Sequence, residues 1–474
     1  MSCVTQLYAT VSFVMQRKWQ VTAIVCVGVF MSSLDLFIVN IAFPAIEADF
    51  GGTSLASLSW VLNAYAIVFA ALLVPAGRWA DAYGRKRVFL TGLAIFVLAS
   101  AACAAAPSVG GLIAARVLQA VGAAFMMPTS LGLMLPEFEP SKRAAAVGIW
   151  AATGGAAAAA GPPLGGLLVE LDWRLVFLVN VPVGIGGLIL GSRLLAERRE
   201  EGALRPDLGG AVAFAAAIAA LVLAIVKGEE WGWGSPQTVG LLAVSALTLA
   251  GIWMRSLRHH SPIVDPTMLR SRQFAAALAG SVLFFAGFGA MLLAGVLFLT
   301  GVWGEDVLTA GLMLAPGPFM AAVFSVPSAR LAARVGFRIP GVIGASLFAV
   351  AAIWWMTQIG SAPAYASEFL PGMILGGIGV GFTIPILTGA GAASLPPERF
   401  ATGIAVITMG RQVGLALGVA ILVAALGAAP SQLSEFEGAW WIMLASAVAS
   451  GVALASLGPA PQPASLPDPV AEPA

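Results

Sequence analysis

Long apolar runs separated by short polar segments dominate this chain. A run of about 18 or more apolar residues is long enough to cross a bilayer as an α-helix. Counted in this way, the sequence predicts fourteen membrane-spanning helices, at roughly 20–45, 60–78, 88–106, 109–134, 143–169, 174–195, 208–226, 236–256, 273–300, 307–330, 338–358, 367–392, 401–428 and 438–457. An even number of spans places both ends of the chain on the same side of the membrane.

The basic residues predict the orientation of these spans. Of the 24 lysines and arginines, twenty lie in the loops on one side of the predicted membrane. Arg174 and Lys227 lie in loops on the opposite side, and Arg116 and Arg411 lie inside predicted helices. Loops rich in lysine and arginine face the cytoplasm. We therefore expect a multi-pass protein of the bacterial plasma membrane with both termini in the cytoplasm.

The composition excludes several classes of protein. Of the 474 residues, 59% are hydrophobic and only 10% are charged, which no soluble domain of this length tolerates. The net charge of +1 argues against nucleic-acid binding. The three cysteines have no metal-binding or redox spacing, and His259 and His260 are adjacent in a polar segment. Because neither an HExxH nor a Walker A motif is present, we expect no enzyme activity, no ATP-driven pumping and no cofactor.

The polar segments divide the chain into units. Two of them, 197–207 and 255–272, bracket the seventh and eighth predicted helices and leave six helices on either side. The sequence thus predicts an all-α polytopic membrane protein with two six-helix bundles and two additional central helices. The predicted boundaries are 1–18 for an N-terminal segment, 19–196 for the first bundle, 197–258 for the linker with the extra helices, 259–458 for the second bundle and 459–474 for a disordered tail. Met15 precedes a basic run and is an alternative start to Met1.

A short charged loop, Gly77–Arg87, lies between the second and third predicted helices, and a weaker copy, Arg330–Arg338, recurs in the second half. Glycines in the loop allow a turn or a close backbone approach. We expect its polar residues to act as a conformational latch, with Asp81 meeting the N-terminus of the thirteenth helix near Phe400–Gly403. The predicted latch residues are Gly77, Arg78, Asp81, Gly84 and Arg85. The alternative is a basic loop that sets only the topology.

Charges deep inside the predicted spans are rare. Asp35 is the only such acid, and Arg116 and Arg411 are the only such cations. A charge in the hydrocarbon costs about 2.5–3.5 kcal/mol on insertion scales, so its presence indicates a function. We interpret Asp35 as a proton carrier tuned by Arg116 and Gln119, with the proton as the coupling ion. The alternative is a purely structural set of ion pairs.

The fifth predicted helix is rich in small residues. Small side chains let two helices touch backbone to backbone, and proline bends a span. The residues that we expect to make such contacts are Gly154, Gly155, Gly161, Pro162, Gly165 and Gly166. Ordinary close packing of helices is the alternative interpretation.

Taken together, these elements resemble the fourteen-helix drug:proton antiporters of the major facilitator superfamily, the QacA/EmrB type. The similar runs begin at Asp35, Trp60, Arg116, Gly161 and Arg411 and extend over most of residues 19–458. The resemblance implies a major facilitator fold and the export of hydrophobic or amphiphilic small molecules by alternating access. We expect polar contacts in the substrate cavity from Asn40, Asn63, Tyr65, Arg411 and Gln412.

The chain departs from that family pattern in three places. Phe37 stands where a threonine is usual, Ala120 replaces a glycine, and the tenth helix carries no second buried acid. Since exporters of divalent cations tend to have that acid, monovalent or neutral amphiphiles are the expected substrates. We expect a monomer whose partners are the substrate and membrane lipid. The sequence leaves open whether a periplasmic adaptor takes part. Symport or uniport of a polar solute, a membrane-embedded enzyme and a receptor are the competing functions.

Overall fold

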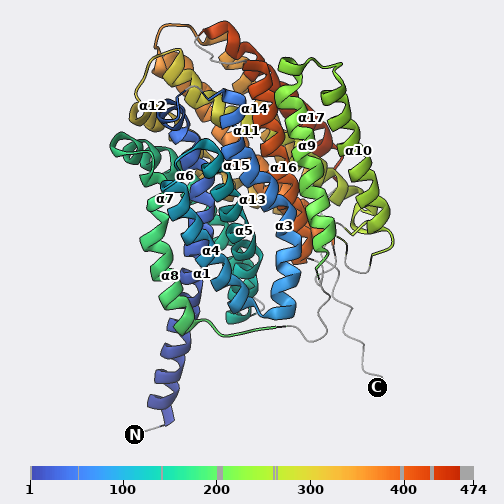
Figure 1. Ribbon diagram of the computed structural model, residues 1–474. Coiled ribbons are helices and arrows are strands. Elements are labelled where there is room, and N and C mark those ends of the chain that lie inside the picture. Colours follow the sequence, from blue (N-terminus) through green and yellow to red (C-terminus); the bar gives the residue numbers. More distant parts are fainter. Residues whose placement is uncertain are drawn as a thin grey trace.

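The computed structural model describes residues 3–51, 53–139, 142–199, 206–259, 262, 265–395, 400–426 and 432–458 (Figure 1). The predicted tail at 459–474 and the start at Met1 lie outside these residues. We call the end of the molecule that carries Asp81 the inner end, because the sequence predicts it to be cytoplasmic, and the end that carries Trp173 the outer end.

Helices and the turns between them make up all of the described residues, without a strand among them. The first part of the chain forms α1 (Cys3–Asp49), α2 (Leu55–Leu58), α3 (Trp60–Tyr83), α4 (Arg85–Ala104), α5 (Val109–Met134), η1 (Leu135–Glu137), α6 (Arg143–Leu171), α7 (Leu175–Leu178) and α8 (Asn180–Leu194). The middle forms α9 (Leu208–Trp231), α10 (Pro236–Ser256) and η3 (Met268–Arg270). The last part forms α11 (Arg272–Gly301), α12 (Val307–Leu314), α13 (Pro316–Val335), α14 (Arg338–Gln358), η4 (Tyr365–Phe369), α15 (Leu370–Ala393), α16 (Phe400–Leu426) and α17 (Leu433–Ala455).

Each predicted span corresponds to one of these helices or to a pair of consecutive ones. Within the described chain, thirteen helical segments are long and apolar enough to cross a membrane. The remaining predicted span is α6, Arg143–Leu171, a helix of 29 residues that contains Pro162 and Pro163. The all-α polytopic class is therefore confirmed. The structure corrects two predicted loops. α9 continues to Trp231, so Lys227 lies within this helix and not in a loop. α3 continues to Tyr83 and α4 begins at Arg85, so only Gly84 of the predicted charged loop Gly77–Arg87 lies outside a helix.

The long helices pack as two groups. One group contains α1, α3, α4, α5, α6 and α8, and the other contains α11 to α17. They meet where α3 packs on α16, where α6 packs on α12 and α13, and where α1 packs on α11. Any substrate path between the groups must run along these three contacts.

The extra helices α9 and α10 stand side by side at one edge of the molecule (Figure 1). α9 packs on both α3 and α16 and therefore spans the seam between the two groups. Its buried positions include many small residues, among them Gly210, Ala211 and Ala217. By contrast, α10 is largely exposed at the periphery, where lipid would surround it.

A buried carboxylate fixes the start of this pair. Asp207 precedes α9 and accepts the backbone N–H of Gly210 at 2.8 Å, as an N-cap does. Its two oxygens also accept Arg255 Nε at 3.0 Å and Arg255 Nη2 at 2.9 Å, from the end of α10. These donors, above all Arg255, hold the pKa of Asp207 below its ordinary value, although burial opposes them. One side chain thus caps α9 and ties it to α10.

A second carboxylate holds the charged loop in place. Gly84 ends α3 with φ at +110°, a conformation that favours glycine, and α4 begins directly after it. Glu197, which follows α8, accepts the backbone N–H groups of Lys86 at 3.0 Å and Arg87 at 3.2 Å. A β-carbon on Gly84 would lie only 2.5 Å from the Glu197 carboxylate. Glycine at this position therefore leaves room for the cap of α4.

We predict that Asp207→Asn lowers the thermal stability of the purified protein at neutral pH. A group whose folded pKa is depressed contributes stability above its unfolded pKa, and this stability is lost as the pH falls through the folded pKa. The stability difference between wild type and Asp207→Asn should therefore be full at neutral pH and vanish in acid. Glu230→Gln is the control, because Glu230 pairs with Lys227 inside α9. A difference that persists unchanged down to the lowest pH at which the protein stays folded would contradict the role given to Asp207.

Candidate functional site

A buried ion pair joins α1 to α5. Asp35 lies in the middle part of α1, and Arg116 lies two turns into α5. Arg116 Nη1 donates to Asp35 Oδ2. The Arg116 side chain is only 1% exposed and the Asp35 side chain 0% exposed. Because the attraction between buried charges must offset a large desolvation penalty, such a pair requires further hydrogen bonds.

Gln119 and the backbone supply these bonds. Arg116 Nη1 also donates to Gln119 Oε1 at 2.6 Å, and Arg116 Nε donates to the carbonyl oxygen of Val61 at 3.1 Å. Gln119 Nε2 donates to Asp35 Oδ1 at 2.8 Å and to Ser100 Oγ at 2.9 Å. The network therefore connects α1, α3, α4 and α5. Both carboxylate oxygens of Asp35 accept a hydrogen bond, which is the arrangement of an ionised aspartate.

Aromatic rings enclose the guanidinium group of Arg116. Its Cζ lies 4.2 Å from the ring centroid of Tyr65 and 5.8 Å from that of Phe177. The neighbourhood also contains buried polar atoms that lack a hydrogen-bond partner among the described residues. They are Asn40 Oδ1, Asn63 Nδ2 and Oδ1, Tyr65 Oη and Asn180 Nδ2. Buried atoms of this kind are rare in folded proteins and mark places where a polar partner can bind.

Asn180 is a candidate that sequence reasoning missed as a site residue. It begins α8 and is 2% exposed. One turn further along α8, a β-carbon on Gly184 would lie 3.1 Å from the side chain of Met31 in α1. Because Asp35 is one turn from Met31, and the two helices run in opposite directions, Asn180 lies at the level of Asp35. A single amide in an apolar helix was the signal in the sequence.

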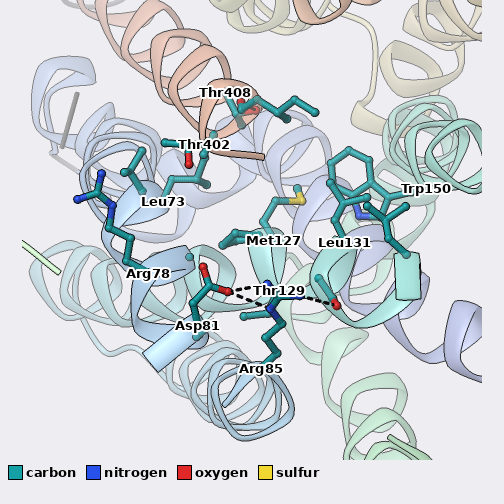
Figure 2. Close-up of a pocket in the computed structure, with 18 of the residues that line it drawn as sticks. Leu73, Arg78, Asp81, Arg85, Met127, Thr129, Leu131, Trp150, Thr402 and Thr408 are labelled. Carbon is teal, nitrogen blue, oxygen red and sulfur yellow. Dashed lines mark hydrogen bonds and ion pairs between the residues drawn. The ribbon is translucent and has the colours of Figure 1, made fainter. Parts of the chain in front are cut away.

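A cavity of about 340 Å³ lies at the inner end, between α3, α5, α6 and α16 (Figure 2). Its wall is mostly apolar, with Met127 and Trp150 among the larger side chains, and Thr408 lies at its α16 side. None of the five predicted substrate-contact residues lines this cavity, and their role stays a prediction. Those residues are Asn40, Asn63, Tyr65, Arg411 and Gln412. The first three are buried between helices of the first group, and the last two lie one helical turn beyond Thr408.

The charged loop borders this cavity. Arg85 Nε donates to Asp81 Oδ1 at 2.9 Å, and Arg85 Nη1 donates to the carbonyl oxygen of Gly132 at 3.1 Å (Figure 2). Arg78 interacts electrostatically with Asp265, beyond α10, as well as with Asp81. Asp81 and Thr402, in the first turn of α16, both line the cavity. The contact of Asp81 with the N-terminus of α16 stays a prediction. Gly77 packs against Pro128 on the same wall.

The small residues of α6 serve two different neighbours. β-Carbons on Gly161 and Gly165 would lie 2.6 Å from Phe37 Cβ and 3.0 Å from Ile38, both in α1. A β-carbon on Gly166 would lie 2.8 Å from Leu308 Cα in α12, which belongs to the other group.

The contact between α6 and α12 also includes the α6 backbone at Pro162. A β-carbon on Gly311 of α12 would collide with it. By contrast, a β-carbon on Gly154 would meet only Ser33 Oγ, at 3.6 Å, and one on Gly155 would meet nothing within 4 Å. The outer ends of the two groups are therefore in backbone contact, while a cavity separates them at the inner end.

The two arginines inside the membrane differ. Arg116 is paired with Asp35, whereas Arg411 forms no ion pair with any described residue and instead lies over the ring of Phe285, at 4.6 Å. Among the described residues, Asp35 is already bonded to Arg116 and leaves no acid deep in the spans for Arg411.

Comparison with known proteins identifies the family. The family model described as Major Facilitator Superfamily matches residues 25–419. The chain belongs to the major facilitator superfamily. It is 35% identical over 408 residues to the tetracenomycin C resistance and export protein of Streptomyces glaucescens, covering 86% of this chain and 75% of that protein. It is also 35% identical to the puromycin resistance protein pur8 of Streptomyces alboniger, covering 88% of this chain and 84% of that protein.

Solved structures show the same fold. The nucleoside transporter NupG superposes with a TM-score of 0.62 at 12% identity, over 93% of this chain and 99% of that structure. The structure of PepTSo2 gives a TM-score of 0.61 at 16% identity, over 92% of this chain and 96% of that structure. At this level of identity the likeness concerns the fold of this family member and not its substrate.

We predict that Arg116→Ala destabilises the protein. Removing one partner of a buried ion pair leaves the other charge uncompensated and costs about 3–5 kcal/mol. The midpoint of thermal unfolding in detergent should fall clearly. Arg174→Ala is the matched control, since Arg174 pairs with Asp49 at the outer surface and its side chain is 34% exposed.

Adding Asp35→Asn to Arg116→Ala should recover part of the lost stability, because it removes the uncompensated carboxylate. If the double variant is less stable than Arg116→Ala, the ion pair is not the main interaction of Arg116.

Proposed function

We propose that this superfamily member is a proton-coupled antiporter of the fourteen-helix QacA/EmrB type. It exports hydrophobic or amphiphilic small molecules across the bacterial plasma membrane, with both termini in the cytoplasm. The single observation that carries this proposal is the buried Asp35–Arg116 pair, a titratable acid within a membrane-spanning helix. The names of the relatives, which describe resistance to and export of antibiotics, support the direction of transport.

In the inner-open conformation, Asp35 holds its charge. Arg116 donates a hydrogen bond to one of its oxygens and Gln119 donates to the other, and these bonds stabilise the ionised form of the aspartate. A substrate enters the inner cavity from the cytoplasm or the inner leaflet and meets an apolar wall. At this stage the outer end is closed by the backbone contact between α6 and α12.

In the outer-open conformation, Asp35 takes up a proton. Protonation removes the charge that holds Arg116, and the network that ties α1 to α5 must rearrange. Arg116 then requires another acceptor, for which the unpartnered Tyr65 Oη is a candidate, since the Arg116 guanidinium already lies over the Tyr65 ring. The substrate leaves outward, and return to the inner-open state releases the proton. The superfamily's alternation of two helix groups around a central site supplies the motion.

Symport or uniport of a polar solute is the main competing function. The ion pair alone serves either direction of coupling. The largely apolar lining of the inner cavity supports an amphiphilic substrate over a polar one. We propose that the protein works as a monomer without a cofactor, and that no adaptor is needed for the transport step itself.

Asp35→Asn should abolish proton-coupled exchange while leaving a folded protein. The assay uses everted membrane vesicles with an acidic lumen, in which substrate uptake releases protons and restores the fluorescence of a pH-sensitive dye. Wild-type vesicles should respond to at least one of three pyrene probes, namely 1-pyrenesulfonate, 1-pyrenemethanol and (1-pyrenylmethyl)trimethylammonium. Asp35→Asn vesicles should respond to none. Asp172→Asn, which changes an exposed acid at the outer end, is the control. Proton release by Asp35→Asn at the wild-type rate would exclude Asp35 as the proton carrier.

Asp81→Asn should slow turnover and favour the inner-open state. When the inner end closes, Asp81 can reach the N-terminus of α16, and an acid at a helix N-terminus contributes about 0.3–2 kcal/mol. A cysteine at Thr408, in a variant whose native cysteines are replaced, reports access from the inner side. It should label faster with a membrane-impermeant maleimide in Asp81→Asn than in the parent. Glu139→Gln, at an exposed acid of the inner surface, is the control. Unchanged labelling and unchanged transport would show that the loop has no latch function.

A further inference from the structure

Arg411 is a cation without a compensating acid in the middle of the protein. It lies on α16 and is partly buried. Among the described residues it forms no ion pair, and its guanidinium stacks on Phe285 of α11 with Cζ at 4.6 Å from the ring centroid. A ring provides some attraction for a cation but does not neutralise its charge. An uncompensated cation in a membrane-spanning helix requires an explanation.

The position of Arg411 is next to the inner cavity. Thr408 lines that cavity, and residues three and four positions further along a helix lie on the same face, one turn deeper. These residues are Arg411 and Gln412. A ligand that fills the cavity and extends one turn toward the membrane centre therefore reaches both side chains.

Close packing of α16 on α11 places the guanidinium on the aromatic ring. A β-carbon on Gly410 would contact the side chain of Leu278 at 2.7 Å, and one on Gly414 would lie 3.0 Å from Phe285 Cβ. The absence of side chains at these two glycines lets the helices approach. Arg411 lies between them in sequence and is held against Phe285 by this approach.

The ring of Phe285 is the first of a row. Its centroid lies 5.6 Å from that of Phe288, which in turn lies 6.3 Å from that of Phe37. Phe37 belongs to α1, two residues after Asp35. The row therefore starts at the cation on α16, follows α11, and crosses to the first group of helices. It is an extended aromatic row with a positive charge at one end, and in this conformation it is largely buried, with Phe285 2% and Phe288 7% exposed.

The nearby acids cannot take the place of a ligand. Asp35 is bonded to Arg116 and Gln119, and Asp81, at the cavity mouth, is bonded to Arg85. Around Arg411 and the inner cavity, the described residues thus offer a free positive group and no free negative one. This arrangement disfavours a cationic substrate, which would face Arg411 without an acid to bind it.

We propose, on the basis of the export function above, that the substrates are planar aromatic compounds with an ionised acidic group. The carboxylate, sulfonate or phenolate of the substrate binds the guanidinium of Arg411, and its ring system packs along Phe285, Phe288 and Phe37. A guanidinium group suits this task because it is planar, remains charged and donates two parallel hydrogen bonds. Gln412 provides a neutral donor beside the same anion.

The test measures binding of the three pyrene probes to purified protein in detergent, by energy transfer from tryptophan to pyrene. The probes share one ring system and carry a fixed negative, zero or positive charge, so pH does not alter them. Wild type should bind 1-pyrenesulfonate more tightly than the trimethylammonium probe. Arg411→Gln should lower the ratio of these two affinities by about tenfold or more, because a charge-assisted hydrogen bond is lost.

Two further variants make the result decisive. Arg411→Lys, which keeps the charge, should retain most of the preference for the anion, and it replaces Arg411→Gln if the latter yields no folded protein. Arg174→Gln is the matched control, since it removes an arginine that stacks on Trp173 at the outer surface, with Cζ at 4.4 Å from the ring centroid. It should leave the ratio unchanged. A ratio equal in wild type, Arg411→Gln and Arg411→Lys would overturn the proposal.

Binding and transport separate this inference from the function on which it rests. If vesicles show proton-coupled uptake but the charge preference does not depend on Arg411, the substrate class is wrong and the antiporter function stands. If the anion binds through Arg411 but no probe releases protons from vesicles, the proton coupling is wrong and the anion site stands.

Discussion

The structure depends on one buried ion pair, and the pair depends on its hydrogen bonds. Asp35 and Arg116 are almost completely inaccessible, in a region where an isolated charge is costly. Gln119 and the carbonyl of Val61 satisfy the remaining donors and acceptors, which makes burial of both charges possible. Four helices are held in register by these few atoms. Because the bonds from Arg116 and Gln119 to α1 both end on the Asp35 carboxylate, a proton on that carboxylate disturbs the attachment of α1 to α5.

In the proposed mechanism, the rest of the molecule converts such a local change into a choice between two ends. At the outer end, Gly166 of α6 contacts α12 with backbone against backbone, a contact that any larger side chain would prevent. At the inner end, the α3 and α16 walls are separated by a cavity that Asp81 borders. Since α1 belongs to the ion-pair network and also packs on α6, α11 and α12, it connects the titratable centre with the contact that closes the outer end.

The fold followed from the sequence more fully than the site did. Apolar runs predict spans because backbone groups in a membrane must be satisfied within a helix, and rare charges such as Asp35 stand out against that background. The sequence does not show which of these residues contact one another in the folded protein. Nothing in the sequence distinguishes Arg116, which has an acid, from Arg411, which has none. The inner cavity is lined by residues such as Met127 and Trp150, whose types are common throughout any membrane protein. The glycines of α6 predict close packing, but the division of that packing between α1 and α12 is a property of the three-dimensional fold.

The central helix pair illustrates how packing and charge combine. α9 contacts α3 and α16, which lie in different groups and line opposite sides of the inner cavity. A helix that packs on two surfaces that move relative to each other must bind neither surface tightly. The glycines and alanines on the buried face of α9 form low ridges, which interlock only weakly with α3 and α16. Its fixed end is elsewhere, at Asp207, which binds Arg255 of α10 and the first turn of α9. Firm attachment within the pair and shallow contact across the seam allow α9 to cover the seam while α3 and α16 change their separation.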